Sequence, residues 1–185
     1  MGPIVVALLS AAPADSSVVE GLELEELASE ADRILLGRVL FSESFQRRDG
    51  QIWTWHRIGV EREILGNAPD EREVIVETMG GRIGEIGMRV EGEASFQVGE
   101  RVLVFVYGGG PYAAYRPVGM GQGVMRVRRE KGVDTVRQSR EGLLLVRRDA
   151  EGRLKRNFGA VPEPARLDAL LSKLRQISAQ QGARR

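Results

Sequence analysis

Few residues in this chain belong to the types that carry out bond-making chemistry. The sequence has no cysteine and a single histidine, His56. The missing thiols exclude disulfides, thiolate zinc sites and cysteine nucleophiles. One histidine leaves little for a metal site or a catalytic triad, and neither Ser95 nor Ser139 sits in a recognisable nucleophile elbow. We therefore expect no catalytic residue, no metal site and no cofactor, and a protein that is not an enzyme.

Two further features have a chemical and a structural interpretation. The run GMGQG at residues 119–123 has the glycine content of a phosphate loop. Such loops need a helix N-terminus after the glycines, whereas GVMRVRR follows here with a strand pattern, so a glycine hairpin or barrel corner is favoured. His56 lies mid-strand and is interpreted as a packed or surface strand residue rather than a pH-sensitive ligand contact.

Aromatic and basic side chains supply the candidate residues for contact with a partner. In OB-folds, strand aromatics stack on bases or sugars. The candidates here are Trp53, Trp55, Tyr112, Tyr115 and Arg82. The formal net charge of +1 and an aromatic content of 5% argue against nucleic acid as the ligand. We expect a protein or a cell-envelope component instead.

Charges are unevenly distributed along the chain. Acidic residues crowd the range 20–32, and basic residues crowd the range 126–156. A solvated face is the ordinary interpretation of each. The alternative is that the two segments attract each other, or attract partners of opposite charge.

The first residues predict export. Residues 4–12 read IVVALLSAA, which is too short to span a bilayer, and Ala12-Pro13-Ala14 places small residues as at a signal-peptidase site. We expect a signal peptide over residues 1–14 and a mature protein that is periplasmic, secreted or envelope-associated. Only three residues precede the run, without positive charge, which a start codon assigned too far downstream would explain. The alternative is an apolar N-terminal strand or a tail.

Glycines and short apolar runs indicate a curved sheet. Glycine makes up 23 of the 185 residues. Period-two patterns predict strands over residues 33–45 and 51–64, joined by an Asp-Gly turn at 47–50, and Gly37 indicates a bend. Further strands are predicted over 73–79, 100–107, 112–118 and 123–129, with a final hairpin over 133–136 and 143–147. The strand at 100–107 is apolar enough to be buried on both faces.

Helical patterns lie at both ends of these strands. Leu24, Leu27, Ala28 and Ala31 share one face within residues 20–32. Pro164 suits the first turn of a C-terminal helix over 164–181, whose leucine stripe packs on the barrel or docks a partner. The predicted fold is mainly β: a small, closed or partly open antiparallel barrel with a short N-terminal helix and an amphipathic C-terminal helix. The predicted domain covers residues 15–149, followed by a linker at 150–163.

Several segments together resemble a known group of proteins. They read ASEADRILLGRV, GGRIGEIGMRVEGEASFQVGERVLVFV and YRPVGMGQGVMRV. Over residues 22–127 the chain resembles exported bacterial proteins of unknown function, whose barrels are similar to the OB-like barrel of netrin-type and tissue-metalloprotease-inhibitor domains. The resemblance therefore implies a small antiparallel OB-like β-barrel. The animal inhibitors chelate the zinc of their target through an N-terminal cysteine, which this chain lacks, so no functional residue is carried over.

The resemblance and the residue types lead to two functional hypotheses. The first is an exported, non-catalytic β-barrel module that binds a protein or a cell-envelope component. The alternative is an inhibitor of an extracellular (metallo)protease that inserts the loop at 80–92 into the active site.

Overall fold

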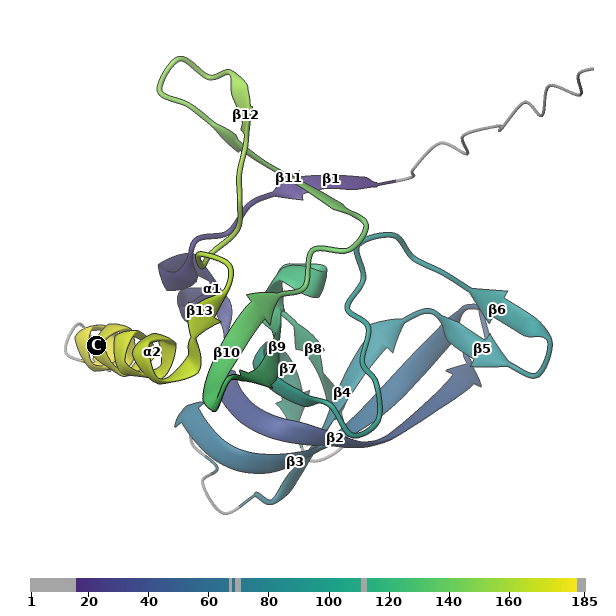
Figure 1. The fold of residues 1–185 in the computed structure, drawn as a ribbon. Helices are drawn as coiled ribbons and strands as arrows, with labels where there is room; N and C mark the ends of the chain where they lie inside the picture. The colour runs from purple at the N-terminus through teal and green to yellow at the C-terminus, as the bar shows by residue number, and fades with distance from the viewer. Residues whose placement is uncertain (1–15, 67, 69–70, 111–112, 183–185) are drawn as a thin grey trace, which may run out of the picture.

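The computed structural model describes residues 16–66, 68, 71–110 and 113–182, which are mainly β with two α-helices (Figure 1). This confirms the mainly β class. The expected signal peptide lies outside the described residues. The helical elements are α1 (Leu24–Glu30), the 3-10 helix η1 (Met120–Gly123) and α2 (Leu167–Gly182). The strands are β1 (Ser17–Glu20), β2 (Arg33–Gln46), β3 (Ile52–Leu65), β4 (Glu73–Met79), β5 (Gly81–Ile83), β6 (Ile86–Met88), β7 (Arg101–Gly110), β8 (Ala113–Pro117), β9 (Val124–Glu130), β10 (Val133–Gln138), β11 (Leu143–Arg148), β12 (Leu154–Arg156) and β13 (Ala165–Arg166).

The main sheet runs in the order β13-β10-β9-β7-β2-β3-β4-β8, and β8 also pairs with β7. Strands β2, β3, β4, β8 and β7 therefore pair in a ring. The ring is joined between β4 and β8 by a single parallel bridge, Val76 to Tyr115, while β9, β10 and β13 extend the sheet outside it. The predicted small antiparallel barrel is thus shown in part, because the ring is not a cleanly closed barrel.

The long β2–β3 hairpin forms as its turn sequence predicts. The amide of Gly50 donates to the carbonyl of Arg47 at 3.0 Å, and Gly50 has a φ of 87°, which favours glycine. The register is irregular between Leu36 and Gly37. A Cβ at Gly37 would lie 2.4 Å from the carbonyl oxygen of Gly59, so only glycine permits this close approach at the bend.

Strand β7 lies between two apolar layers. Val102, Val104 and Val106 are fully buried in one core cluster, inside the ring. Leu103 and Phe105 are fully buried in the other, against α1 and α2. The strand is therefore buried on both faces, as its continuous apolar run predicts.

Both helices contribute their apolar stripes to the second cluster. The buried side chains of α1 are Leu24, Leu27 and Ala28. Those of α2 are Leu167, Leu170, Leu171, Leu174 and Ile177. The apolar periodicity of each segment therefore identified the face that is buried.

Several local predictions need correction. The first helix is shorter than 20–32, because residues Ser17–Glu20 form β1 and pair in parallel with β11. The last helix begins at Leu167 rather than near Pro164, because Ala165–Arg166 pairs with β10. The GMGQG run forms a 3-10 turn, η1, rather than a hairpin. The range 150–163 includes strand β12.

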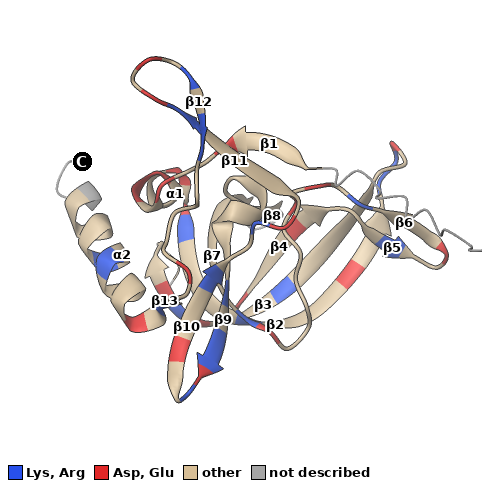
Figure 2. Cartoon of the chain, turned by 45° about the horizontal axis from the view of Figure 1, so that its top comes forward, with Lys and Arg blue, Asp and Glu red and all other residues tan. Residues whose placement is uncertain are grey.

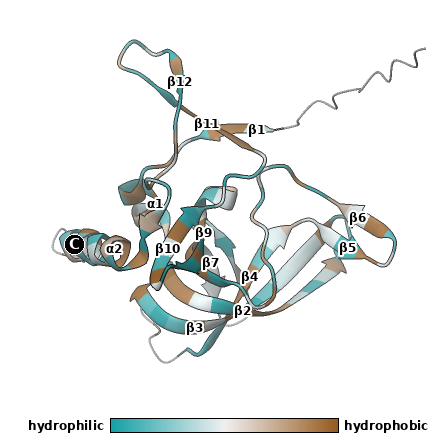
Figure 3. Ribbon diagram, in the orientation of Figure 1, coloured by the Kyte–Doolittle hydropathy of each residue, from teal (hydrophilic) through white to brown (hydrophobic). Residues whose placement is uncertain are grey.

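A small hairpin, β5–β6, projects beside the main sheet (Figure 1). The chain leaves β4 through Gly80 and Gly81, whose φ angles of 105° and 138° are readily adopted by glycine. Ile83 and Ile86 pair across the hairpin tip and are 38% and 65% exposed. The hairpin therefore exposes hydrophobic side chains, and Figure 3 shows the hydrophobic colour in this part of the ribbon.

Candidate functional site

A cavity of about 400 Å³ lies at the turn end of the β2–β3 hairpin. Its floor comes from β2, β3 and the end of β4, and its wall comes from residues 88–96, which follow the projecting hairpin. Cavities of this size hold small ligands or single side chains. We call this cavity the hairpin pocket.

The floor of the hairpin pocket contains a chain of three polar side chains. Ser42 Oγ lies 2.8 Å from Nδ1 of His56, and Nε2 of His56 lies 2.9 Å from Oγ1 of Thr78. Ser42 and His56 face each other in the β2–β3 register, and His56 adjoins Val76 of β4. In either neutral tautomer one ring nitrogen donates and the other accepts, so one of the two hydroxyls keeps a proton free for a ligand.

His56 is deeply buried, as expected for a packed strand residue. It is 4% exposed, and its ring lies against Phe96 with the ring centres 4.6 Å apart. Burial lowers the pKa of His56 to about 4. The imidazole is therefore neutral near neutral pH.

A second hydroxyl chain lies beside the first and has a fixed direction. Thr54 donates its hydroxyl proton to the carbonyl of Gly80 at 2.6 Å. Ser44, 2.9 Å from Thr54, must then donate to Thr54 Oγ1, because a hydroxyl has one proton. Ser44 Oγ in turn accepts from the amide of Arg82 at 3.2 Å. This chain anchors the start of β5 to the floor of the hairpin pocket.

The rim of the hairpin pocket carries three carboxylates and one arginine. Arg89 pairs with Glu91 and lies 3.8 Å from Glu141. Glu93 forms no ion pair with any described residue and accepts a hydrogen bond from the amide of Ala94 at 3.0 Å. Burial raises the pKa of Glu93, although backbone hydrogen bonds from Ala94 and Met79 and the charge of Arg116 oppose this shift.

The Ser42–His56 pair has the spacing of a nucleophile and its base but not the electrostatics. A general base works best with a pKa near the operating pH, far above the value of about 4 for His56. The imidazolium formed in catalysis needs a carboxylate to stabilise it, and Thr78 offers only a neutral hydroxyl. Among the described residues, His56 thus has no carboxylate partner of the kind found in a catalytic triad.

The predicted contact residues are distributed over different environments. Trp53 is 4% exposed, and its ring lies 4.0 Å from the guanidinium of Arg47 and 4.4 Å from that of Arg116. Trp55 is 45% exposed and donates from Nε1 to Glu77 at 3.0 Å. The structure thus places most of the Trp53 surface against this chain, and leaves part of Trp55 open to solvent.

The remaining candidates do not gather with the tryptophans. Arg82 is exposed on β5, where its Nε donates to the carbonyl of Gly84 at 3.0 Å. The hydroxyl of Tyr115, on β8, accepts a hydrogen bond from Arg33 at 3.3 Å. Tyr112 lies outside the described residues. Of the four candidates that the structure describes, Arg82 alone is connected to the hairpin pocket, through its backbone amide.

Tyr115 belongs to a buried ionic cluster at the opposite end of β2 and β3. The guanidinium of Arg33 contacts both oxygens of Glu63, at 3.1 and 3.2 Å, and also contacts Glu71 and the carbonyl of Ala68. Arg33 is 1% exposed. Burial lowers the pKa of Arg33, but hydrogen bonds to Glu63, Tyr115 and Glu71 raise it above the ordinary value. We call these residues the Arg33 cluster.

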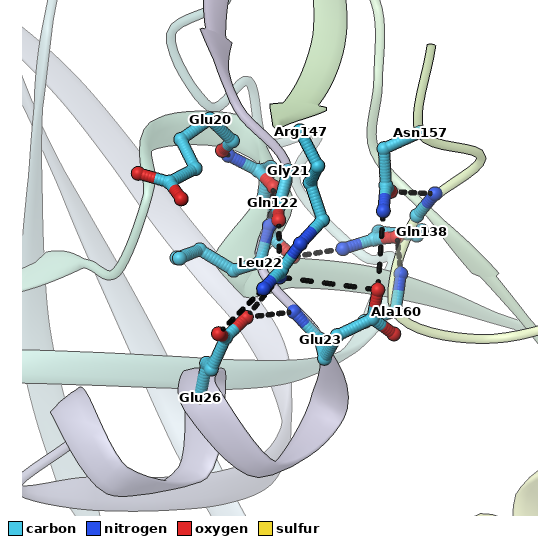
Figure 4. A network of polar contacts seen from close by, with 11 residues as sticks. Glu20, Gly21, Leu22, Glu23, Glu26, Gln122, Gln138, Arg147, Asn157 and Ala160 are labelled. Atoms are coloured by element: carbon cyan, nitrogen blue, oxygen red, sulfur yellow. Dashed lines mark hydrogen bonds and ion pairs between the residues drawn. The ribbon is translucent and has the colours of Figure 1, made fainter. Parts of the chain in front are cut away.

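A third polar network joins the N-terminal segment to the second half of the chain (Figure 4). Gln122, 1% exposed, accepts from the amide of Leu22 at 2.9 Å and donates to the carbonyl of Glu20 at 3.0 Å. Arg147 binds Glu26 at 3.0 Å, so the acidic segment and one residue of the basic segment do attract each other. Figure 2 shows acidic residues on α1 and basic residues on β9 and β12.

Neither the hydroxyl groups of the hairpin pocket nor Glu93 was among the site residues predicted from the sequence. A signal was available for the strand residues. The period-two patterns place Ser42 and Ser44 on one face of the first strand and Thr54 and His56 on one face of the second. The observed register pairs Ser44 with Thr54 and Ser42 with His56. Glu93 carried no such signal, because a long loop brings it to the hairpin pocket.

In comparisons with known proteins, no family model and no curated protein matches the chain. The parts of the chain that the structure describes contain no group of three or more histidine, aspartate or glutamate side chains placed to hold a metal ion. Among the described helices, none has both the length and the apolar character needed to cross a bilayer.

Proposed function

We propose that this chain is an exported, non-catalytic module that binds a protein or a cell-envelope component through the β5–β6 hairpin. The observation that carries the proposal is the tip of the hairpin, where Ile83 and Ile86 are exposed side by side. Exposed apolar side chains on a projecting element are typical of protein contact surfaces. The low pKa of His56 supports the non-catalytic part of the proposal.

The OB-like character of the barrel is part of this proposal. The pairing ring of β2, β3, β4, β8 and β7 supports it, since an OB-fold is a five-stranded, partly open Greek-key barrel. The resemblance to netrin-type and metalloprotease-inhibitor domains depends on the same ring. Export through a signal peptide cleaved after Ala14 is tested by N-terminal sequencing of the protein recovered from its native cells.

Crosslinking from the hairpin tip tests the binding function. A photoreactive amino acid replaces Ile86 in the full chain, and a matched variant carries it at Leu154, which is 58% exposed on the distant strand β12. We expect a discrete adduct from position 86 that is absent from position 154 and disappears when Ile83 is changed to Asp. Identical adducts from both positions, or none from position 86, would contradict the proposal.

The projecting hairpin also favours the alternative function, inhibition of an extracellular (metallo)protease by loop insertion. In that case the adduct contains a protease, and the purified chain inhibits it. The I83D variant then loses inhibition while L154D retains it. An adduct with a protein that is not a protease supports the binding module instead.

A further inference from the structure

We propose that the hairpin pocket accepts an alkyl-ammonium or guanidinium group, carried on a lysine or arginine side chain of the protein partner. This inference rests on the proposed binding function, because the hairpin that would contact the partner forms one border of the cavity. The inference adds to the proposed function the chemistry of the group that enters the hairpin pocket.

The shape and lining of the hairpin pocket fit a long side chain with a polar end. The volume of about 400 Å³ exceeds that of one side chain. Apolar atoms of Met79, Met88, Val90 and Phe96 line the walls, and the hydroxyls of Ser42 and Thr78 lie on the floor. Lysine and arginine have this distribution, with an apolar stem and a polar head.

The charge of the rim selects a cation. Arg89 already pairs with Glu91 and lies near Glu141, so its charge is compensated within the rim. Glu93 has no ion-pair partner among the described residues, and the nearby Arg116 lies against Trp53 and 3.5 Å from Glu77. An entering cation would supply the missing partner for Glu93. A charge-assisted hydrogen bond to a desolvated carboxylate is among the stronger polar contacts.

The floor accommodates a cation because its groups are neutral and can accept hydrogen bonds. A protonated His56 would repel a positive charge, but its burial keeps it neutral above pH 5 or so. Each hydroxyl oxygen of the Ser42–His56–Thr78 chain has two lone pairs, of which the imidazole occupies at most one. Neutral acceptors therefore line the floor of the cavity, and the carboxylate of Glu93 lies on the rim of the same cavity.

Peptide titrations on the full, isotope-labelled chain test the inference. The probes are blocked tripeptides Gly-Lys-Gly and Gly-Arg-Gly at millimolar concentration, with Gly-norleucine-Gly as the uncharged control of equal stem length. We expect the charged peptides to shift the amide signals of Gly80, Gly81 and Gly92, which line the hairpin pocket, and to leave those of Gly132 and Gly152 unchanged. The control should bind at least about tenfold more weakly.

The matched variants are Glu93→Gln and Glu141→Gln. Glutamine at position 93 keeps an acceptor for the amide of Ala94, so the loop retains this contact, and thermal unfolding of the variant checks it. We expect E93Q to weaken binding of Gly-Lys-Gly by about tenfold or more and E141Q to leave it within about twofold. Equal binding by the norleucine control, unchanged binding by E93Q, or no shift in the wild type would each overturn the inference.

Two further measurements are needed. One distinguishes a partner side chain from a small amine as the source of the cation, and the other distinguishes failure of this inference from failure of the proposed function. Butylammonium that binds while Gly-Lys-Gly does not would overturn the assignment to a partner side chain in favour of a small amine. Crosslinking from position 86 does not depend on Glu93. Retained crosslinks without peptide binding reject only the hairpin-pocket inference, whereas lost crosslinks reject the proposed function.

Discussion

Strands β2 and β3 carry a buried polar cluster at each end, and the two clusters differ in how their charges are balanced. At one end, the guanidinium of Arg33 is surrounded by Glu63, Glu71 and Tyr115. At the other end, His56 lies between two hydroxyls, and Glu93 forms no ion pair with a described residue, although the charge of Arg116 acts on it. A cavity of about 400 Å³ adjoins the second cluster.

This difference in charge balance distinguishes a cluster that stabilises the fold from a cluster that offers a ligand-binding site. The cost of burying the Arg33 charge is offset within the chain, because Glu63, Glu71, Tyr115 and the carbonyl of Ala68 all accept hydrogen bonds from the guanidinium. The desolvation of Glu93 is not offset in this way, and its pKa is raised by burial. A group whose charge is unbalanced at the wall of a cavity is therefore where we expect a ligand to contribute the missing charge.

Removing the guanidinium should have the largest effect. We expect Arg33→Met to lower the free energy of unfolding by about 3–5 kcal/mol, because Glu63 would be left charged and buried without its partner. Arg38→Met on the same strand is the control, since its side chain is 51% exposed, and should change stability by no more than about 0.5 kcal/mol. Denaturant titration measures both, and equal effects would show that the Arg33 cluster is not a special determinant of stability.

Protonation of His56 should have the next largest effect. Its folded pKa of about 4 lies below the ordinary value of 6.5, so the folded state binds fewer protons than the unfolded state. The contribution to stability is full above pH 6.5 and is lost as the pH falls towards 4, by up to about 3 kcal/mol. The single histidine allows direct titration of its imidazole by NMR.

The variant His56→Gln provides the control for this pH dependence. It removes the titrating group, so the wild type should lose more stability than the variant between pH 6.5 and pH 4. Glu93 titrates in both proteins with its pKa raised, and its contribution cancels in the comparison. Parallel stability curves, or an imidazole that titrates near pH 6.5, would contradict the burial argument.

Neutralising one glutamate in each cluster compares the two ends most directly. We expect Glu63→Gln to lower the free energy of unfolding by about 2 kcal/mol, because Arg33 loses a charged, two-oxygen acceptor. Glu93→Gln should leave stability unchanged or slightly higher at neutral pH, since it removes a desolvated carboxylate that has no described ion-pair partner. A loss of stability in E93Q equal to that in E63Q would remove the distinction between the clusters.

Sequence patterns predicted the elements whose formation depends on residues that are close together in the chain. The Asp-Gly turn predicted the β2–β3 hairpin, and the period-two patterns placed Ser42 and His56 on the faces that the observed register brings together. The apolar run at 100–107 indicated a strand buried on both faces, and the leucine stripes indicated which helix faces are buried. These signals are local, because side-chain period and turn chemistry act over a few residues.

Contacts between distant residues decided the rest. β1 forms only because β11, more than a hundred residues later, supplies its hydrogen-bond partners. Ala165–Arg166 likewise joins β10, which moves the start of the last helix to Leu167. No local pattern reports such pairings, since an isolated strand of two to four residues has no stability of its own.

The sequence by itself determined a mainly β chain without cysteine, with one histidine, and with glycine at the points where strands bend or turn. The tertiary structure decided which polar residues act together. It placed Glu93 beside the His56 floor and balanced Arg33 with Glu63 and Glu71. The physical reason is that the balance of charge in a buried site depends on which distant segments exclude water from it, and chain order does not record this.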